Sequence, residues 1–143
     1  MVMSRPEKGA GRGGKEARED VWIPLQFQID AGSGLAEKWR VIHVIATVEL
    51  VEGKRADFLK AFKAIKRRVL AERGCREYGA AVDLPTQIPG QQPVRAQTVV
   101  VIEEWASVAA LERHLQAPHM LAFFAQIGPF SKSVRIQVLE PAG

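Results

Sequence analysis

The stretch Ile42-His43-Val44-Ile45-Ala46-Thr47-Val48-Glu49-Leu50 decides the fold, because its strongly apolar positions recur with a period of two. That period is typical of a β-strand with one buried face. Glu52-Gly53 then turns the chain. A predicted helix follows, and its one-face apolar positions are Phe58, Phe62, Ile65 and Val69, with Leu59 and Leu70 beside them. We expect Gly74 to end that helix as its C-cap.

The rest of the chain completes the same pattern. Residues 76–84 and 97–105 are predicted strands, separated by a Pro- and Gly-rich loop. The apolar run 99–102 is typical of a strand covered on both faces. Ser107 caps a short helix to about Gln116, Pro118 starts a second one that ends at Gly128, and residues 132–140 alternate as a last strand.

This order, β-α-β-β-α(α)-β, predicts an α+β fold of the ferredoxin-like type, with the helices on one face of the sheet. The other sheet face, on which Ile45 lies, would be bare in a monomer. Because exposed apolar faces of this kind mark contacts, we expect a homodimer that pairs through the sheets. His43 points to that face and is assigned to the interface.

Length and composition fit one globular domain. The chain has 143 residues, of which 47% are hydrophobic and 25% charged. Its single cysteine, Cys75, cannot form an internal disulfide. No apolar run approaches the ~20 residues of a membrane helix, and the N-terminus has no signal-peptide pattern. We therefore expect a cytoplasmic protein with no membrane partner.

The N-terminal forty residues differ from the rest. Residues 1–20 combine Gly with both charge signs and are predicted to be a disordered segment. Residues 21–40 are a loosely attached extension with a possible edge strand at 22–29. Gly14-Lys15 fits a phosphate-binding loop, but Glu16 stands where Ser or Thr is needed. The core domain is expected over residues 41–140.

Basic residues concentrate in the first predicted helix. Eight Lys or Arg face only two acids between Lys54 and Arg73. Aromatic residues do not interleave with them on the polar side, and no nucleic-acid motif accompanies them. We interpret them as a solvated helix face and expect no nucleic-acid partner.

Three motifs resemble one family. Glu72-Arg73-Gly74-Cys75-Arg76-Glu77-Tyr78 resembles the E-P-G-C-x-x-Y junction of the antibiotic biosynthesis monooxygenase family, which lies in the dimeric α/β barrel superfamily. Glu103-Glu104-Trp105 is similar to its E-x-W strand end. The segment 111–123 is similar to its L-x-x-H-x-x-x-P-H-x-x-x-F helix pair. Arg73 replaces the usual proline, and the loop 85–94 is longer than usual.

The resemblance implies a cofactor-independent monooxygenase that oxidises a quinol or polyhydroxylated aromatic molecule with O₂. Two alternatives stay open: a non-catalytic small-molecule-binding or stress-response barrel, and an isomerase of a small carbonyl compound. Haem-binding relatives look to need Asn, Trp and His where this chain has Ala46, His114 and Phe124. The resemblance therefore argues against haem, and no cofactor is expected.

The candidate catalytic residues are His114 and His119, because imidazole titrates near physiological pH. His114 could instead be a half-buried structural histidine bonded to a backbone carbonyl, and His119 lies at a predicted helix N-terminus. They do not share a helical face, so no metal site is expected. The candidate substrate-binding residues are Trp105, Tyr78, Phe123, Phe124 and Glu103.

The alternative for the two polar aromatics is a place in the core, and for Glu103 an ion pair with Arg. Cys75 is interpreted as structural. We expect the segment 111–123 to wall an apolar pocket against the sheet, with His114 or His119 exposed to its interior.

Overall fold

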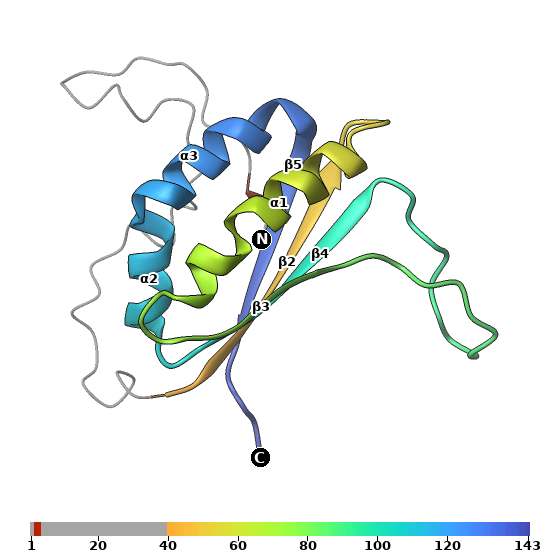
Figure 1. Ribbon diagram of the computed structural model, residues 1–143. Helices are drawn as coiled ribbons and strands as arrows, with labels where there is room; N and C mark the ends of the chain where they lie inside the picture. The colour runs from red at the N-terminus through yellow and green to blue at the C-terminus, as the bar shows by residue number, and fades with distance from the viewer. Residues whose placement is uncertain (1, 4–39) are drawn as a thin grey trace.

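The computed structural model describes residues 2–3 and 40–143, which form a sheet with helices on one face (Figure 1). The strands are β1 (Val2–Met3), β2 (Ile42–Leu50), β3 (Cys75–Ala81), β4 (Thr98–Trp105) and β5 (Ser131–Leu139). The helices are α1 (Arg55–Leu70), α2 (Val108–Gln116), α3 (Pro118–Ile127) and the short 3₁₀ turn η4 (Gly128–Phe130). The predicted α+β, ferredoxin-like fold is confirmed.

The sheet is antiparallel in the order β1-β5-β2-β4-β3. Strand β1 pairs only through Val2 with Arg135 and Met3 with Val134. Apart from Val2, Met3 and Arg40, the predicted disordered segment 1–20 and the extension 21–40 lie outside the described residues, so those boundaries stay predictions. None of the helices in the described part is long and apolar enough to cross a membrane.

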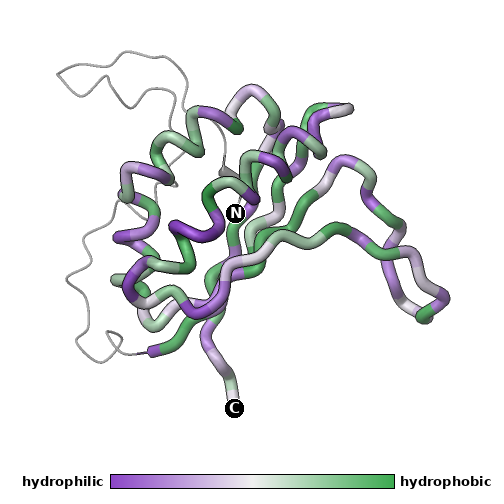
Figure 2. The backbone as a smooth tube through the Cα atoms, viewed as in Figure 1, coloured by the Kyte–Doolittle hydropathy of each residue, from purple (hydrophilic) through white to green (hydrophobic). Residues whose placement is uncertain are grey.

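The period of two in β2 translates directly into burial. Ile42, Val44, Ala46, Val48 and Leu50 are all buried under the helices. The apolar strands run beneath the helical layer in Figure 2. The run 99–102 in β4 is covered on one face only, because Val99 and Val101 are buried while Ile102 is 39% exposed on the other face. Full coverage of β4 is therefore wrong for the single chain.

Strand β3 ends at Ala81, three residues earlier than predicted. Beyond it the chain leaves the sheet as a long arm, residues 82–97, which projects from the body in Figure 1. Pro85 removes a backbone N–H from any continued ladder. The arm is closed at its base, where the backbone N–H, Nε and Nη2 of Arg95 each donate to Asp83 at 2.8 Å.

Gly74 is not the C-cap of α1, because the cap falls on Ala71. Gly74 lies three residues later, in the turn into β3, with φ +89°. A Cβ at this position would lie 2.7 Å from the Cβ of Ala110 in α2. The glycine is needed both for its left-handed backbone and for the close approach of α2.

Candidate active site

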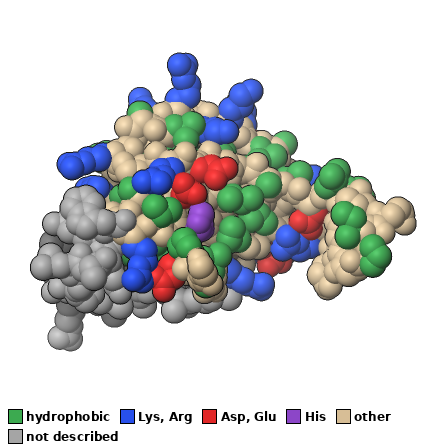
Figure 3. Space-filling model, turned by 90° about the horizontal axis from the view of Figure 1, so that it is seen from below, with side chains coloured by type: hydrophobic (Ala, Val, Ile, Leu, Met, Phe, Trp, Pro, Cys, Tyr) green, Lys and Arg blue, Asp and Glu red, His purple; other side chains and the backbone are tan. Residues whose placement is uncertain are grey.

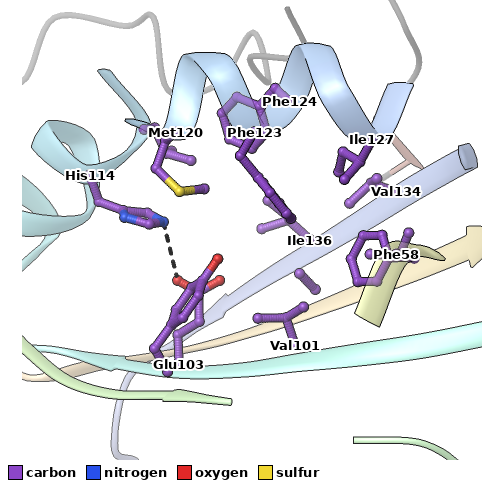
Figure 4. Close-up of a pocket in the computed structure, with 14 residues that line it drawn as sticks. Phe58, Val101, Glu103, His114, Met120, Phe123, Phe124, Ile127, Val134 and Ile136 are labelled. Atoms are coloured by element: carbon purple, nitrogen blue, oxygen red, sulfur yellow. Dashed lines mark ion pairs between the residues drawn. The ribbon is translucent and has the colours of Figure 1, made fainter. Parts of the chain in front are cut away.

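A cavity of about 60 Å³ lies between the helices and the sheet, as the close-up in Figure 4 shows. Its walls come from β2, β3, β4, β5, α1, α2 and α3. The lining residues are mostly apolar: Ala46, Val48, Phe58, Tyr78, Val101, Glu103, His114, Leu115, Met120, Phe123, Phe124, Ile127, Val134 and Ile136. The expected apolar pocket is present, and His114 faces its interior.

His114 reaches the cavity because of where α2 starts and which of its faces is buried. The Ser107 Oγ accepts a hydrogen bond from the Ala110 N–H at 3.1 Å and starts the helix. The buried positions Ala110, Leu111 and Leu115 then fix which helix face meets the sheet. His114 shares that face and is only 1% exposed.

The partner of His114 is the carboxylate of Glu72, which lies between α1 and β3. Nδ1 of His114 is 2.8 Å from Oε2 of Glu72. The expectation of a half-buried histidine bonded to a backbone carbonyl is therefore wrong on both points. The carboxylate holds one ring nitrogen, and the other nitrogen stands at the cavity wall.

His119 binds the same carboxylate oxygen from the second helix of the pair. Its Nε2 is 2.8 Å from Oε2 of Glu72, and its side chain is 19% exposed. The break at Ala117-Pro118 turns the chain so that α3 starts beside the end of α2. His119 does not line the cavity, so the structure brings both histidines to Glu72 but only His114 to the pocket.

The charge state of Glu72 decides which group donates the hydrogen bond between Glu72 and His114. Burial by itself would raise the pKa of Glu72, but the hydrogen bonds and charges of His114 and His119 outweigh it and leave the pKa below its ordinary value. An ionised carboxylate only accepts hydrogen bonds. His114 therefore donates its Nδ1–H to Glu72, and its Nε2 is the ring nitrogen that this bond does not use.

Glu103 closes the polar end of the site from β4. Its Oε1 accepts the Trp105 Nε1–H at 2.8 Å and lies 4.0 Å from Nε2 of His114. Burial raises the pKa of Glu103, against the opposing effects of the His114 charge and the Trp105 hydrogen bond. One imidazole is thus flanked by two carboxyl groups whose pKa values are displaced in opposite directions. Figure 4 shows the contact between His114 and Glu103.

The candidate aromatic residues fall into two groups. Trp105 is fully buried and does not line the cavity; its ring centroid lies 4.6 Å from that of His114. Tyr78 does line it, stacked on Phe62 at 4.8 Å and edge-on to His114 at 5.4 Å. Phe123 and Phe124 both stand in the wall. Trp105 therefore contacts Glu103 and His114 from behind the cavity and does not line it.

The hydroxyl of Tyr78 is buried and makes no hydrogen bond to any described residue. Burial, followed by the nearby charges of Glu103 and Glu72, raises the pKa of Tyr78 well above its ordinary value. The hydroxyl is therefore neutral and able to donate. Tyr78 pairs with Glu103 across the β3–β4 ladder, so both polar groups belong to one end of the cavity.

Glu72 is the site residue that sequence reasoning missed. It is the first residue of the Glu72-Arg73-Gly74-Cys75 junction, which could have marked it. The neighbouring Cys75 has its pKa raised to about 11, chiefly by burial, so its thiol is neutral. Within residues 2–3 and 40–143, no group of three or more His, Cys, Asp or Glu is arranged to hold a metal ion.

A one-faced ferredoxin-like sheet with an apolar cavity and a carboxylate-bridged histidine pair defines a small α+β domain suited to binding a small molecule. Residues 41–126 match the antibiotic biosynthesis monooxygenase family, and the chain belongs to that family. The resemblance inferred from its motifs is confirmed.

Named relatives agree with this assignment. The chain is 34% identical over 103 residues to "Probable quinol monooxygenase YgiN" of Escherichia coli (strain K12), with 71% of this chain and 98% of that protein aligned. The solved structure of PA3566 from Pseudomonas aeruginosa has a TM-score of 0.60 and 25% identity, covering 73% of this chain and 96% of that one. Rv0793 from Mycobacterium tuberculosis has a TM-score of 0.59 and 26% identity, covering 72% and 96%.

Proposed function

We propose that the protein is a cofactor-independent monooxygenase that oxidises a quinol or other polyhydroxylated aromatic molecule with O₂. The observation that carries this proposal is the orientation of His114. Its Nδ1 is held 2.8 Å from the Glu72 carboxylate, and its other nitrogen faces an apolar cavity. An imidazole that is oriented by a carboxylate beside an apolar cavity is placed to act as a general base. The similarity to the E. coli protein supports the substrate class.

The chemistry needs only the substrate, O₂ and a base. Nε2 of His114 takes the proton of a ring hydroxyl, and the phenolate bonds through a ring carbon to O₂. The imidazolium returns the proton to the resulting peroxide. The hydrogen on the same ring carbon then leaves as a proton while the O–O bond breaks, which yields a carbonyl and water. The substrate supplies all four electrons that reduce O₂.

The surrounding residues assist in distinct ways. Glu72 favours the Nδ1–H tautomer and stabilises the imidazolium that forms. Tyr78 and Glu103 orient the substrate hydroxyl at the polar end. The apolar wall of Phe123, Phe124 and Met120 excludes water from the reacting anion and the peroxide.

Oxygen uptake tests the proposal. The purified protein, mixed with a panel of quinols and catechols in air-saturated buffer, should consume O₂ faster than protein-free controls and release the oxygenated quinone without hydrogen peroxide. Catalase addition separates the two outcomes, because it returns O₂ only if peroxide is the product. Binding without uptake would favour the non-catalytic alternative, and uptake with peroxide release would replace the monooxygenase by an oxidase.

We also propose that two copies pair through the open sheet face. On that face Ile45 and Ile102 are adjacent in register, and Gly79 continues the row. His43 and Glu104, 3.5 Å apart, lie at one end of the strands and Arg135 nearer the other. Figure 3 shows hydrophobic side chains in the middle of this face, between acidic side chains with a histidine and the projecting arm. A second copy would cover the apolar centre.

A further inference from the structure

The cavity is polar at one end and apolar everywhere else. Its polar lining consists of His114, Glu103 and Tyr78 alone among the described residues. Figure 4 shows His114 and Glu103 at one end, and Phe58, Ile127 and Val134 at the opposite end. The ladder pairing of Tyr78 with Glu103 assigns the tyrosine to the polar end as well.

The three groups at the polar end have unused hydrogen-bonding capacity. The Tyr78 hydroxyl has no hydrogen-bond partner among the described residues, and Tyr78 is buried, with only 4% of its surface exposed. Glu103 uses Oε1 for Trp105, and the described structure assigns no hydrogen bond to Oε2. Nε2 of His114 makes no hydrogen bond to a described residue, and it lies 4.0 Å from Oε1 of Glu103. Three polar groups that line one end of a cavity and have atoms without hydrogen bonds fit a ligand that presents more than one hydroxyl at that end.

One step further along the strands, the cavity wall has no polar side chain. Inward-facing residues of β4 alternate, so the next one after Glu103 is Val101, which pairs with Ala46 on β2. Two strand residues span about 7 Å, which is comparable with the width of a benzene ring carrying hydroxyls at opposite carbons. A hydroxyl across the ring would therefore lie over Val101 and Phe123, where the lining offers no partner.

The size of the cavity limits the ligand too. At about 60 Å³ it is smaller than the ~150 Å³ in which an apolar cavity holds benzene, so even one ring needs side chains to move. Met120 is the lining residue with the most flexible side chain. Phe124 and Ile136, which also line the cavity, are only half-buried. These adjustments suit a single ring better than a fused or multi-ring molecule.

We propose that this site selects a single aromatic ring whose hydroxyl groups all lie on one edge, as in a catechol, over the isomer with hydroxyls at opposite carbons. The inference deepens the proposed function and rests on it for the choice of an aromatic ligand. It concerns recognition, so binding can be measured with turnover stopped.

The test is isothermal titration of the full chain under nitrogen with catechol, resorcinol and hydroquinone, which share one composition. We expect catechol to bind at least about tenfold more tightly than hydroquinone, because the latter buries one hydroxyl without a partner. Equal or tighter binding of hydroquinone would overturn the proposal. So would an absence of binding by all three isomers.

A pair of variants tests whether the preference for catechol arises at Val101. Val101→Thr places a hydroxyl under the far side of the ring, and should narrow the preference for catechol at least about threefold. Val99→Thr is the matched control, since Val99 is buried on the same face of β4 but does not line the cavity. An unchanged preference in a folded Val101→Thr protein would contradict the placement; if that protein does not fold, the wild-type isomer series still decides.

Oxygen uptake with the same isomers separates this inference from the proposed function. Tight catechol binding without uptake would support the ligand class and contradict the oxidation. Uptake driven best by hydroquinone would overturn the ligand class and leave the oxidation standing.

Discussion

Glu72 and His114 are 42 positions apart, yet Oε2 of the one lies 2.8 Å from Nδ1 of the other. The same oxygen lies 2.8 Å from Nε2 of His119. One carboxylate at the α1–β3 junction thus ties together the two helices that wall the cavity. It also sets which nitrogen of the buried histidine faces the cavity.

His114→Gln should lower turnover by roughly 10²-fold or more, the usual contribution of a general base. Gln is preferable to Ala here, because His114 is among the largest fully buried side chains and a truncation would leave a void. His119→Gln should lower turnover less, since His119 lies outside the cavity. Initial rates of oxygen uptake check both, with circular dichroism as the folding control. Full activity in both variants would move the search to Tyr78 and Trp105.

Glu72→Gln should destabilise the protein by about 1–3 kcal/mol at pH 7, because two histidine donors lose their charged acceptor. The pKa of Glu72 is lowered on folding, so its contribution is present above the unfolded value near 4.5 and is lost as pH falls through the folded value. The difference between wild type and variant should therefore shrink below pH 4. Urea unfolding at several pH values measures it, and a constant difference would count against an ionised Glu72.

Glu103→Gln should change the pH dependence of stability in the opposite direction to Glu72→Gln. The pKa of Glu103 is raised, so its contribution is full below the unfolded value of 4.5 and is lost as pH rises through the folded value. Gln keeps an oxygen for the Trp105 N–H but carries no charge to bury. Relative to wild type, the variant should gain stability as pH rises above 4.5 in the same urea experiment. A relative loss with rising pH would show that the ionised carboxylate is stabilised in the fold.

Gly74→Ala should be strongly destabilising, by about 2 kcal/mol or more, because it combines backbone strain with a 2.7 Å approach to Ala110. Gly53→Ala is the matched control. Gly53 also has a positive φ, of 80°, but its added Cβ would meet nothing within 4 Å. Thermal melts of the two variants should differ, and equal melting temperatures would mean that α2 yields without penalty.

Ile102→Lys should convert the proposed dimer to a monomer, because it places a charge in the apolar centre of the open sheet face. Leu70→Lys changes a similarly exposed residue, at 43%, on α1, and should leave the dimer intact. Light scattering at micromolar concentration measures both. A monomeric wild type, or a dimeric Ile102→Lys protein, would contradict pairing through this face.

The sequence by itself determined the elements and the residues they bury. Periods of two and 3.6 report which side of a strand or helix is apolar, and they predicted β2, α1 and the pair α2–α3 within a few residues of their observed bounds. The position of His114 on the apolar face of α2 followed from the same spacing. So did the apolar wall, because Leu115, Phe123 and Ile127 repeat on the inner faces of two consecutive helices.

Only the tertiary structure decided the contacts between those elements. Glu72 occupies a polar turn in the sequence, and although it opens the Glu72-Arg73-Gly74-Cys75 junction, its spacing does not reveal which side chains it meets. Its role comes from the packing of α1 and β3 against α2, which Gly74 permits by having no Cβ. Trp105 was equally ambiguous, because an aromatic residue at a strand end packs into the core or lines a pocket according to the helix above it. The period of the apolar residues encodes which face of an element is buried. Which side chains meet across that face depends on how elements distant in the sequence pack together.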